Sequence, residues 1–146
     1  MVDTICIAVG LSPSIELAAQ AGCVIEYIQE LGGYVPLRND DMRTSVPDLF
    51  VAGDVSGIEE ATTAMIEGRI AGLTIVEDLT GRCDQEKLNY LKETLRKFRS
   101  GPSSSKTRSG IRKLGGKVEE ASFSERIECD FDSYKGKLRP IIECFE

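Results

Sequence analysis

The sequence predicts an α/β fold, and two kinds of hydrophobic pattern support this. Two short apolar runs, residues 5–9 and 49–52, are continuous rather than alternating, and each is followed by a glycine. Such runs are typical of strands that are buried on both faces inside a parallel sheet. In residues 61–75 and 88–98 the apolar positions instead recur at helical spacing. Buried strands followed by amphipathic helices indicate an α/β architecture.

Length and composition are those of an ordinary globular chain. The chain has 146 residues, of which 41% are hydrophobic and 29% are charged, enough for one domain or slightly more. Its net charge of -6 argues against non-specific binding to nucleic acid. The absence of histidine excludes the commonest general base and the commonest metal ligand. No apolar run is as long as a membrane span, so we expect no membrane partner.

The cysteines predict reduced thiols. They are Cys6, Cys23, Cys83, Cys129 and Cys144, and no two of them form a C-x-x-C pair. A redox dithiol or a zinc knuckle therefore has no support, and the odd count with wide spacing argues against a disulfide framework. Asp3 also lies where a signal peptide would carry its basic region, so we expect a protein of the reducing cytoplasm.

The first part of the chain predicts a strand, a short helix and a hairpin. The strand at 5–9 ends at Gly10, and Ser14 is a plausible N-cap for a helix whose apolar face would consist of Leu17, Ala18 and Ala21. Residues 23–28 and 34–37 then flank a turn at 30–33 that contains two glycines, which is the pattern of a hairpin. Pro36 marks the second strand of the hairpin as an edge strand.

The stretch from Thr44 to Asp54 carries the strongest functional signal. After a turn, the apolar run 49–52 leads into Gly53 and Asp54, which places a carboxylate at the carboxyl edge of a sheet, where open α/β folds bind ligands. A helix is predicted from about Ile58 or Glu59 to Thr80, so that its amino-terminal amides would face the same crevice. One face of this helix carries mostly small residues: Ala61, Ala64, Met65, Gly68, Ala71, Gly72 and Ile75.

The remaining segments are predicted as a helix, a linker and a tail. Residues 83–99 have the pattern of an amphipathic helix with a stripe of Leu88, Leu91, Leu95 and Phe98, which would pack on the domain or, with its basic residues, bind an anionic surface. Residues 100–110 are rich in serine and glycine and predict a flexible linker. They lack the Gly-Lys-Ser/Thr ending of a phosphate loop. Residues 111–146 predict a small, irregular carboxyl-terminal segment.

The run from Thr44 through the apolar residues to Gly53 and Asp54 resembles the second flavin-binding motif of FAD-dependent pyridine nucleotide-disulfide oxidoreductases, flavoproteins with two dinucleotide-binding domains. The resemblance covers about residues 1–82 and implies the carboxyl-terminal part of an FAD/NAD(P)-binding, Rossmann-like domain. It implies FAD as the cofactor, with NAD(P) in the full assembly. In such proteins the strand matching residues 5–10 carries the chain from the NAD domain back to the FAD domain. Val9 departs from the pattern there, because threonine is common at that position.

The resemblance also implies which residues meet the cofactor. Asp54 would hydrogen-bond the ribityl chain of FAD, and the backbone amides near Thr62 and Thr63 would approach the pyrimidine edge of the flavin. The implied cofactor-binding residues are Gly10, Thr44, Gly53, Asp54, Val55, Ala61, Thr62 and Thr63. The sequence indicates no catalytic acid or base and no metal ligand, since hydride chemistry belongs to the flavin.

The runs at 57–61 and 67–72 are similar to flavoprotein subunits of opine oxidase, hydrogen cyanide synthase and heteromeric sarcosine oxidase. This similarity implies a substrate that is an amine, an amino-acid-like compound or a pyridine nucleotide. The tail near Cys144 resembles the segment that precedes an iron–sulfur motif in such assemblies, which implies a possible partner in the form of an iron–sulfur segment or subunit. One cysteine cannot hold a cluster, which needs about four thiolates.

The sequence contains no G-x-G-x-x-G fingerprint, the turn that cradles the pyrophosphate of a dinucleotide. We therefore expect an incomplete FAD site and an exposed sheet edge. The chain would be a fragment, a subunit completed by a partner that supplies the amino-terminal half, or a half domain that associates with itself. The alternative from a different class is a non-catalytic interaction module that uses the exposed edge to bind a partner.

Overall fold

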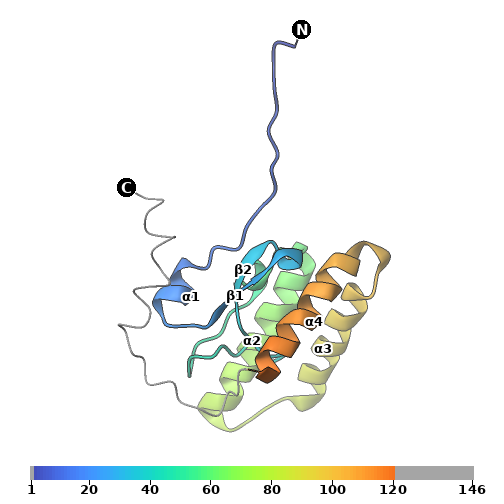
Figure 1. The fold of residues 1–146 in the computed structure, drawn as a ribbon. Helices are drawn as coiled ribbons and strands as arrows, with labels where there is room; N and C mark the ends of the chain where they lie inside the picture. Colours follow the sequence, from blue (N-terminus) through green and yellow to red (C-terminus); the bar gives the residue numbers. More distant parts are fainter. Residues whose placement is uncertain (1, 121–146) are drawn as a thin grey trace.

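The computed structural model describes residues 2–120 of the chain. Three long helices pack beside a small hairpin, and the amino-terminal segment runs away from this body (Figure 1). The elements in chain order are α1 (Glu16–Gln20), β1 (Ile25–Ile28), η1 (Gln29–Leu31), β2 (Gly33–Pro36), η2 (Gly53–Ser56), α2 (Ala61–Thr80), α3 (Gln85–Arg99), η3 (Pro102–Ser104) and α4 (Ser105–Glu120), where η marks a 3-10 helix. The predicted α/β class, with a hairpin followed by helices, is confirmed.

The hairpin forms where the apolar runs around the two glycines predict it. β1 and β2 pair antiparallel, with Ile25 opposite Pro36 and Ile28 opposite Gly33. Tyr27 and Tyr34 face each other across the strands, and their rings meet edge to face with centroids 5.1 Å apart. Aromatic pairs of this kind stabilise a hairpin beyond the area that they bury.

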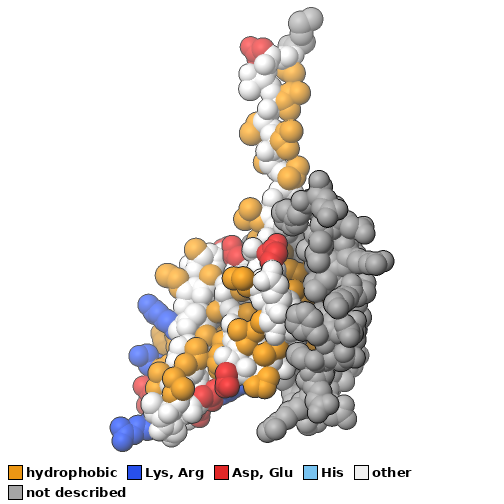
Figure 2. Space-filling view, turned by 90° about the vertical axis from the view of Figure 1, so that its left-hand side faces the viewer, with side chains coloured by type: hydrophobic (Ala, Val, Ile, Leu, Met, Phe, Trp, Pro, Cys, Tyr) orange, Lys and Arg blue, Asp and Glu red, His pale blue; other side chains and the backbone are white. Residues whose placement is uncertain are grey.

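The predicted buried strand at residues 5–9 is wrong. These residues form part of an extended arm, residues 2–12, which leaves the body with its apolar side chains exposed (Figures 1 and 2). Ile5, Ile7 and Val9 are 78%, 79% and 92% exposed. A parallel strand is held by hydrogen bonds to neighbouring strands. The only strands within residues 2–120 pair with each other in the hairpin, so the arm has none beside it.

The run at 49–52 is also not the fully buried parallel strand that its composition predicts. Only Val51 is buried, and the segment pairs with the preceding loop rather than with a parallel neighbour. Phe50 forms an isolated antiparallel bridge with Arg43. The Val51 amide donates to the Met42 carbonyl at 3.1 Å. The local loop therefore supplies the hydrogen bonds that a larger sheet would otherwise provide.

Two helix predictions need correction in detail. Ile15, not Ser14, is the N-cap of α1, and Leu17 is 81% exposed instead of lying on the buried face. α2 ends at Thr80 as predicted, but it begins at Ala61 and buries a face other than the predicted small-residue face. The face of α2 that packs inward consists of Thr63, Ile66, Glu67, Ile70, Ala71 and Thr74. Met65, in contrast, is 60% exposed.

α3 confirms the amphipathic pattern. The Asp84 carboxylate accepts a hydrogen bond from the Lys87 amide at 3.0 Å and so caps the helix. The side chains of Leu88, Leu91 and Leu95 pack against α2, where they join Ile66 and Ile70 in a core cluster. Phe98 lies at the edge of this stripe and is 48% exposed.

The flexible linker predicted at 100–110 is wrong, because α4 begins at Ser105 and continues through this segment. Leu114 of α4 is buried in a cluster with Leu31 and the hairpin. A Cβ added at Gly110 would lie only 2.7 Å from Leu31 Cγ, so the glycine allows α4 to approach the hairpin closely. The tail predicted as irregular, including Cys129 and Cys144, lies outside the described residues from 121 onward.

Gly110→Ala is expected to destabilise the chain by about 1–3 kcal/mol, because the added methyl overpacks the contact with Leu31. Gly116→Ala is the matched control on the same helix, where no atom lies within 4 Å of the added methyl. There, alanine should raise stability by about 0.5–1 kcal/mol through helix propensity. Urea unfolding followed by circular dichroism measures both. Equal effects would contradict the close packing of α4 on η1.

Two further findings complete the architecture. A third core cluster joins Ala18 of α1, Cys23 and Val51, and it fixes α1 to the loop that precedes η2. Within residues 2–120, no helix combines the length and the hydropathy needed to cross a lipid bilayer.

Candidate functional site

The predicted Gly-Asp turn lies on the first turns of α2. Gly53 begins η2 with a φ of +78°, a conformation that side chains rarely adopt. A Cβ added there would lie 3.3 Å from the Ala64 Cβ, so the turn lies directly against α2. The Ser56 hydroxyl donates to the Gly53 carbonyl at 2.9 Å, and the Gly57 amide donates to the Asp54 carbonyl at 3.2 Å. The turn from Gly53 to Val55 is thus closed by its own backbone and by α2.

The Asp54 side chain is available to a ligand. It is exposed, and it makes no hydrogen bond or ion pair with any of the described residues. Val55, next to it, points the other way and packs on the cluster around Cys23 and Val51. Asp54 therefore presents a carboxylate to solvent from a fixed backbone.

The amino-terminal turn of α2 follows the Gly-Asp turn in the chain. Glu60 is the N-cap with extended backbone, and its side chain caps no amide. The Glu60 carbonyl accepts from the Thr63 hydroxyl at 2.7 Å and from the Thr63 amide at 3.0 Å. The amides of Ala61 and Thr62 have no acceptor among residues 2–120, as expected for the first turn of a helix.

The structure separates two predicted residues from this group. Thr44 is buried, and its hydroxyl donates to the Leu49 carbonyl at 2.9 Å while accepting from the Val46 amide at 3.1 Å. It therefore holds the loop that leads into Gly53. Gly10 lies in the exposed arm, where no atom comes within 4 Å of an added Cβ. Gly53, Asp54 and Val55 lie in η2, which packs against α2, and Ala61, Thr62 and Thr63 form the first turn of α2, whereas Thr44 and Gly10 lie outside both elements.

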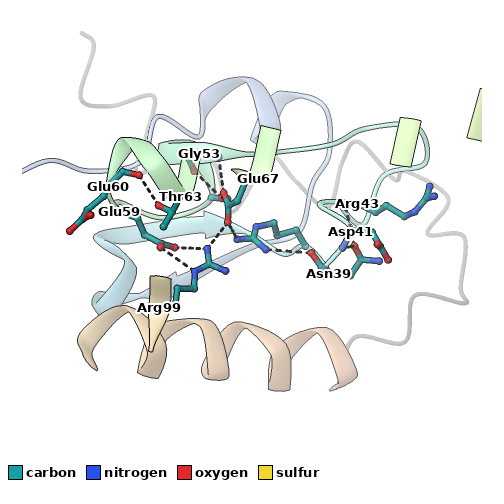
Figure 3. Close-up of polar contacts among 11 residues, drawn as sticks. Asn39, Asp41, Arg43, Gly53, Glu59, Glu60, Thr63, Glu67 and Arg99 are labelled. Carbon is teal, nitrogen blue, oxygen red and sulfur yellow. Dashed lines mark hydrogen bonds and ion pairs between the residues drawn. The ribbon is translucent and has the colours of Figure 1, made fainter. Parts of the chain in front are cut away.

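A buried carboxylate holds the turn from behind. Glu67 of α2 is 2% exposed, and one of its oxygens accepts from the Gly53 amide at 2.8 Å and from the Ser56 hydroxyl at 3.1 Å. Its other oxygen accepts from the guanidinium groups of Arg38 at 2.5 Å and Arg99 at 2.6 Å (Figure 3). One side chain thus joins η2, the loop after β2 and the end of α3.

The charges of this cluster are balanced by a second carboxylate. Glu59 accepts from Arg99 through two nitrogens, at 2.6 and 3.1 Å (Figure 3). Burial would lower the pKa of Arg99, but the hydrogen bonds and negative charges of Glu59 and Glu67 raise it above its ordinary value. Burial lowers the pKa of Arg38 despite the opposing charge of Glu67. The two arginines and two glutamates form a neutral, largely buried network.

Sequence reasoning did not find this network. Arg38, Glu67 and Arg99 are far apart in the sequence, and each residue type is common on surfaces. A weak signal existed in Glu67, because α2 places this charge among Thr63, Ile66 and Ile70 on the inward face. Buried charges are paired in folded proteins, but the partners became evident only in the structure.

A protein family model matches the amino-terminal part of the chain. Residues 1–68 match the family model described as "Pyridine nucleotide-disulphide oxidoreductase". This range contains the arm, the hairpin, the Gly-Asp turn and the start of α2, but neither α3 nor α4. No solved structure gave a significant match.

Curated relatives match about half of the chain. An opine oxidase subunit of Agrobacterium tumefaciens is 37% identical over 70 residues, which cover 48% of this chain and 14% of that protein. The corresponding opine oxidase subunit of Rhizobium meliloti is 39% identical over 70 residues, covering 48% and 13%. NADH oxidase of Methanocaldococcus jannaschii is 31% identical over 85 residues, covering 51% and 18%. The chain thus spans less than a fifth of each of these relatives.

The family match covers the sequence motif from Thr44 to Asp54, and the fold around the Gly-Asp turn is compatible with it. The amino-terminal part of the chain, residues 1–68, is therefore similar to the pyridine nucleotide-disulphide oxidoreductase family.

Proposed function

We propose that this chain supplies the ribityl and flavin-ring side of an FAD site in an FAD-dependent oxidoreductase. The observation that supports this most is that the Gly-Asp turn, with its exposed Asp54 carboxylate, packs against α2, whose first amides, those of Ala61 and Thr62, have no acceptor among residues 2–120. Both lie within the segment that matches the flavoprotein family.

The available groups fit one end of FAD and not the other. The Asp54 carboxylate can accept hydrogen bonds from ribityl hydroxyls, and the α2 amides can donate to the carbonyl edge of a flavin ring. The Gly53 amide is already bonded to Glu67 and is not available. Residues 2–120 contain no glycine-rich cradle for a pyrophosphate.

The chain's own residues would position the cofactor rather than react. A bound flavin supplies the hydride chemistry of such enzymes. Asp54 would anchor the ribityl chain, and the positive end of the α2 dipole would favour negative charge on the ring edge next to Ala61 and Thr62. Glu67 would keep the Gly-Asp turn rigid through its bond to the Gly53 amide.

The remainder of the site would come from a segment that carries the G-x-G-x-x-G turn, on another polypeptide or elsewhere in the same protein. Two open apolar surfaces support this. The arm, residues 2–12, is apolar on both faces and has an unpaired backbone. One face of α2 is also open, with Met65 exposed and space beside Gly68 and Gly72. A sheet completed by the arm would cover its apolar side chains and satisfy its backbone.

Further features of the assembly belong to the same proposal. The relatives named as opine oxidase subunits support an amine or amino-acid-like substrate and a role as one subunit of a larger enzyme. The relative named NADH oxidase supports NAD(P) as a second nucleotide. We place the protein in the cytoplasm because its cysteines predict reduced thiols, and an iron–sulfur partner stays a prediction.

The exposed arm, residues 2–12, favours one alternative function. In this alternative the chain is an interaction module whose arm pairs with a strand of a partner protein, and it does not bind FAD.

FAD binding to Asp54→Ala tests the proposed site, measured in the presence of a polypeptide that carries the amino-terminal G-x-G-x-x-G unit of the family. Loss of a hydrogen bond to a charged group costs about 1.5–3 kcal/mol, so FAD affinity should fall at least about tenfold. Glu86→Ala is the control, because Glu86 is an exposed carboxylate on α3 outside the proposed site and should leave affinity unchanged. The quenching of flavin fluorescence during titration measures both. Equal affinities for the two variants would contradict the role of Asp54.

A further inference from the structure

A cavity lies away from the Gly-Asp turn, in a groove between α3 and α4. It has a volume of about 260 Å³, slightly below the range of roughly 300–1,000 Å³ typical of ligand pockets. Its walls carry four basic side chains, Lys92, Arg96, Arg99 and Arg108, and one acidic side chain, Asp40. Its apolar lining consists of Met42, Leu95 and Ile111. The size indicates an occupant smaller than a dinucleotide.

The basic side chains differ in how far their charge is already neutralised. Lys92 forms an ion pair with Asp41 at 2.5 Å, and Arg99 is held by two glutamates. Arg96 has only loose contacts, the shorter being 3.6 Å to Asp40, and both of those side chains are largely exposed. Arg108 has no carboxylate partner within residues 2–120. Two guanidinium groups at the groove are therefore available to an anion.

Arg108 is also fixed in position. One of its terminal nitrogens donates to the Arg99 carbonyl at 2.8 Å and to the Gly101 carbonyl at 3.1 Å, at the corner between α3 and η3. These bonds leave the other nitrogens of the guanidinium without a described acceptor. A guanidinium that is already oriented loses little conformational entropy when it binds a carboxylate.

We propose that this groove binds a small carboxylate with an apolar chain. The carboxylate would lie between Arg96 and Arg108, whose planar forks match its two oxygens. The apolar chain would cover Met42, Leu95 and Ile111, which a bare hydrated anion would leave exposed to water. Most of the groove is formed by α3 and α4, which lie outside residues 1–68, and none of the residues proposed to meet the flavin lines it.

Titration of the full chain with hexanoate tests this site. Amide shifts are followed by NMR at constant ionic strength, with acetate and inorganic phosphate titrated as comparisons. Hexanoate should give saturable shifts in α3 and α4, and it should bind at least several-fold more tightly than acetate or phosphate. Arg108→Gln should weaken hexanoate at least about tenfold, since it removes a charge-assisted hydrogen bond.

Two further variants keep the test decisive. Arg96→Gln should weaken hexanoate several-fold, and it carries the test if Arg108→Gln disturbs the α3–η3 corner, because Arg96 makes only loose contacts. Lys97→Gln is the control, since Lys97 is exposed on α3 outside the groove and should leave affinity unchanged. Non-saturable shifts, equal weakening by Lys97→Gln, or phosphate binding as tight as hexanoate would overturn the proposal.

Discussion

Glu67→Ala should reduce the free energy of unfolding by about 3–5 kcal/mol, the usual cost of breaking a buried ion pair from one side. Glu67 is 2% exposed and bonds Arg38, Arg99, Gly53 and Ser56. Removal of the Glu67 carboxylate leaves only Glu59 to balance the buried positive charges of Arg38 and Arg99. It also deprives the Gly53 amide of its hydrogen-bond acceptor. Since natural domains are stable by only about 5–15 kcal/mol, this loss is a large fraction of the total.

The size of this effect is best judged against two other variants. Glu67→Gln keeps the shape and an acceptor oxygen but loses the charge, so its destabilisation should be smaller than that of alanine. Glu93→Ala removes an exposed glutamate whose one ion pair is 3.9 Å long, and it should change stability by less than about 0.5 kcal/mol. Urea unfolding provides the free energies. Similar values for Glu67→Ala and Glu93→Ala would show that the network does not hold the turn.

The second large effect concerns the arm. Val9→Asp should weaken pairing of the arm with a completing strand at least about a hundredfold, because a carboxylate would enter an apolar, desolvated sheet. Val9 is 92% exposed in this structure, so the substitution should leave the chain's own stability nearly unchanged. Leu17→Asp, at an 81% exposed position outside the arm, is the matched control and should not affect pairing.

Cysteine labelling reports on this pairing. Cys6 lies in the arm and is exposed, so it should react rapidly with a thiol reagent in the isolated chain and slowly once the arm is paired. Cys23 is buried, and burial raises the pKa of its thiol, so it should react slowly in both states. Protection of Cys6 that survives Val9→Asp, or a marked loss of stability in that variant, would contradict the role of the arm.

Local patterns predicted the elements that local interactions stabilise. The hairpin followed from two apolar runs around paired glycines, and α3 followed from the spacing of Leu88, Leu91 and Leu95. Residues 5–9 and 49–52 have the composition of buried parallel strands. Such strands depend on neighbours that are distant in sequence, and residues 2–120 do not provide them.

The linker prediction failed because it relied on amino-acid composition and not on the spacing of apolar residues. The serine and glycine residues of 100–110 suggested a linker, although Ile111, Leu114 and Val118 recur at i, i+3 and i+7, which is helical spacing. The Gly-Asp turn was predicted from its motif, but its support by Glu67 was not. That support depends on arginines from two other elements, and a single sequence gives no sign of such distant pairing.

The visible absorbance spectrum of the purified chain, with added FAD, tests the proposed flavin site most directly. It is recorded with and without a polypeptide that carries the amino-terminal G-x-G-x-x-G unit of the family. Because Asp54 and the start of α2 provide only the ribityl and ring side, a protein-bound flavin band should appear only when that unit is present. A bound band in the chain alone would show that no completing segment is needed. No bound band in either sample would contradict the assignment of Asp54 and α2 to a flavin site.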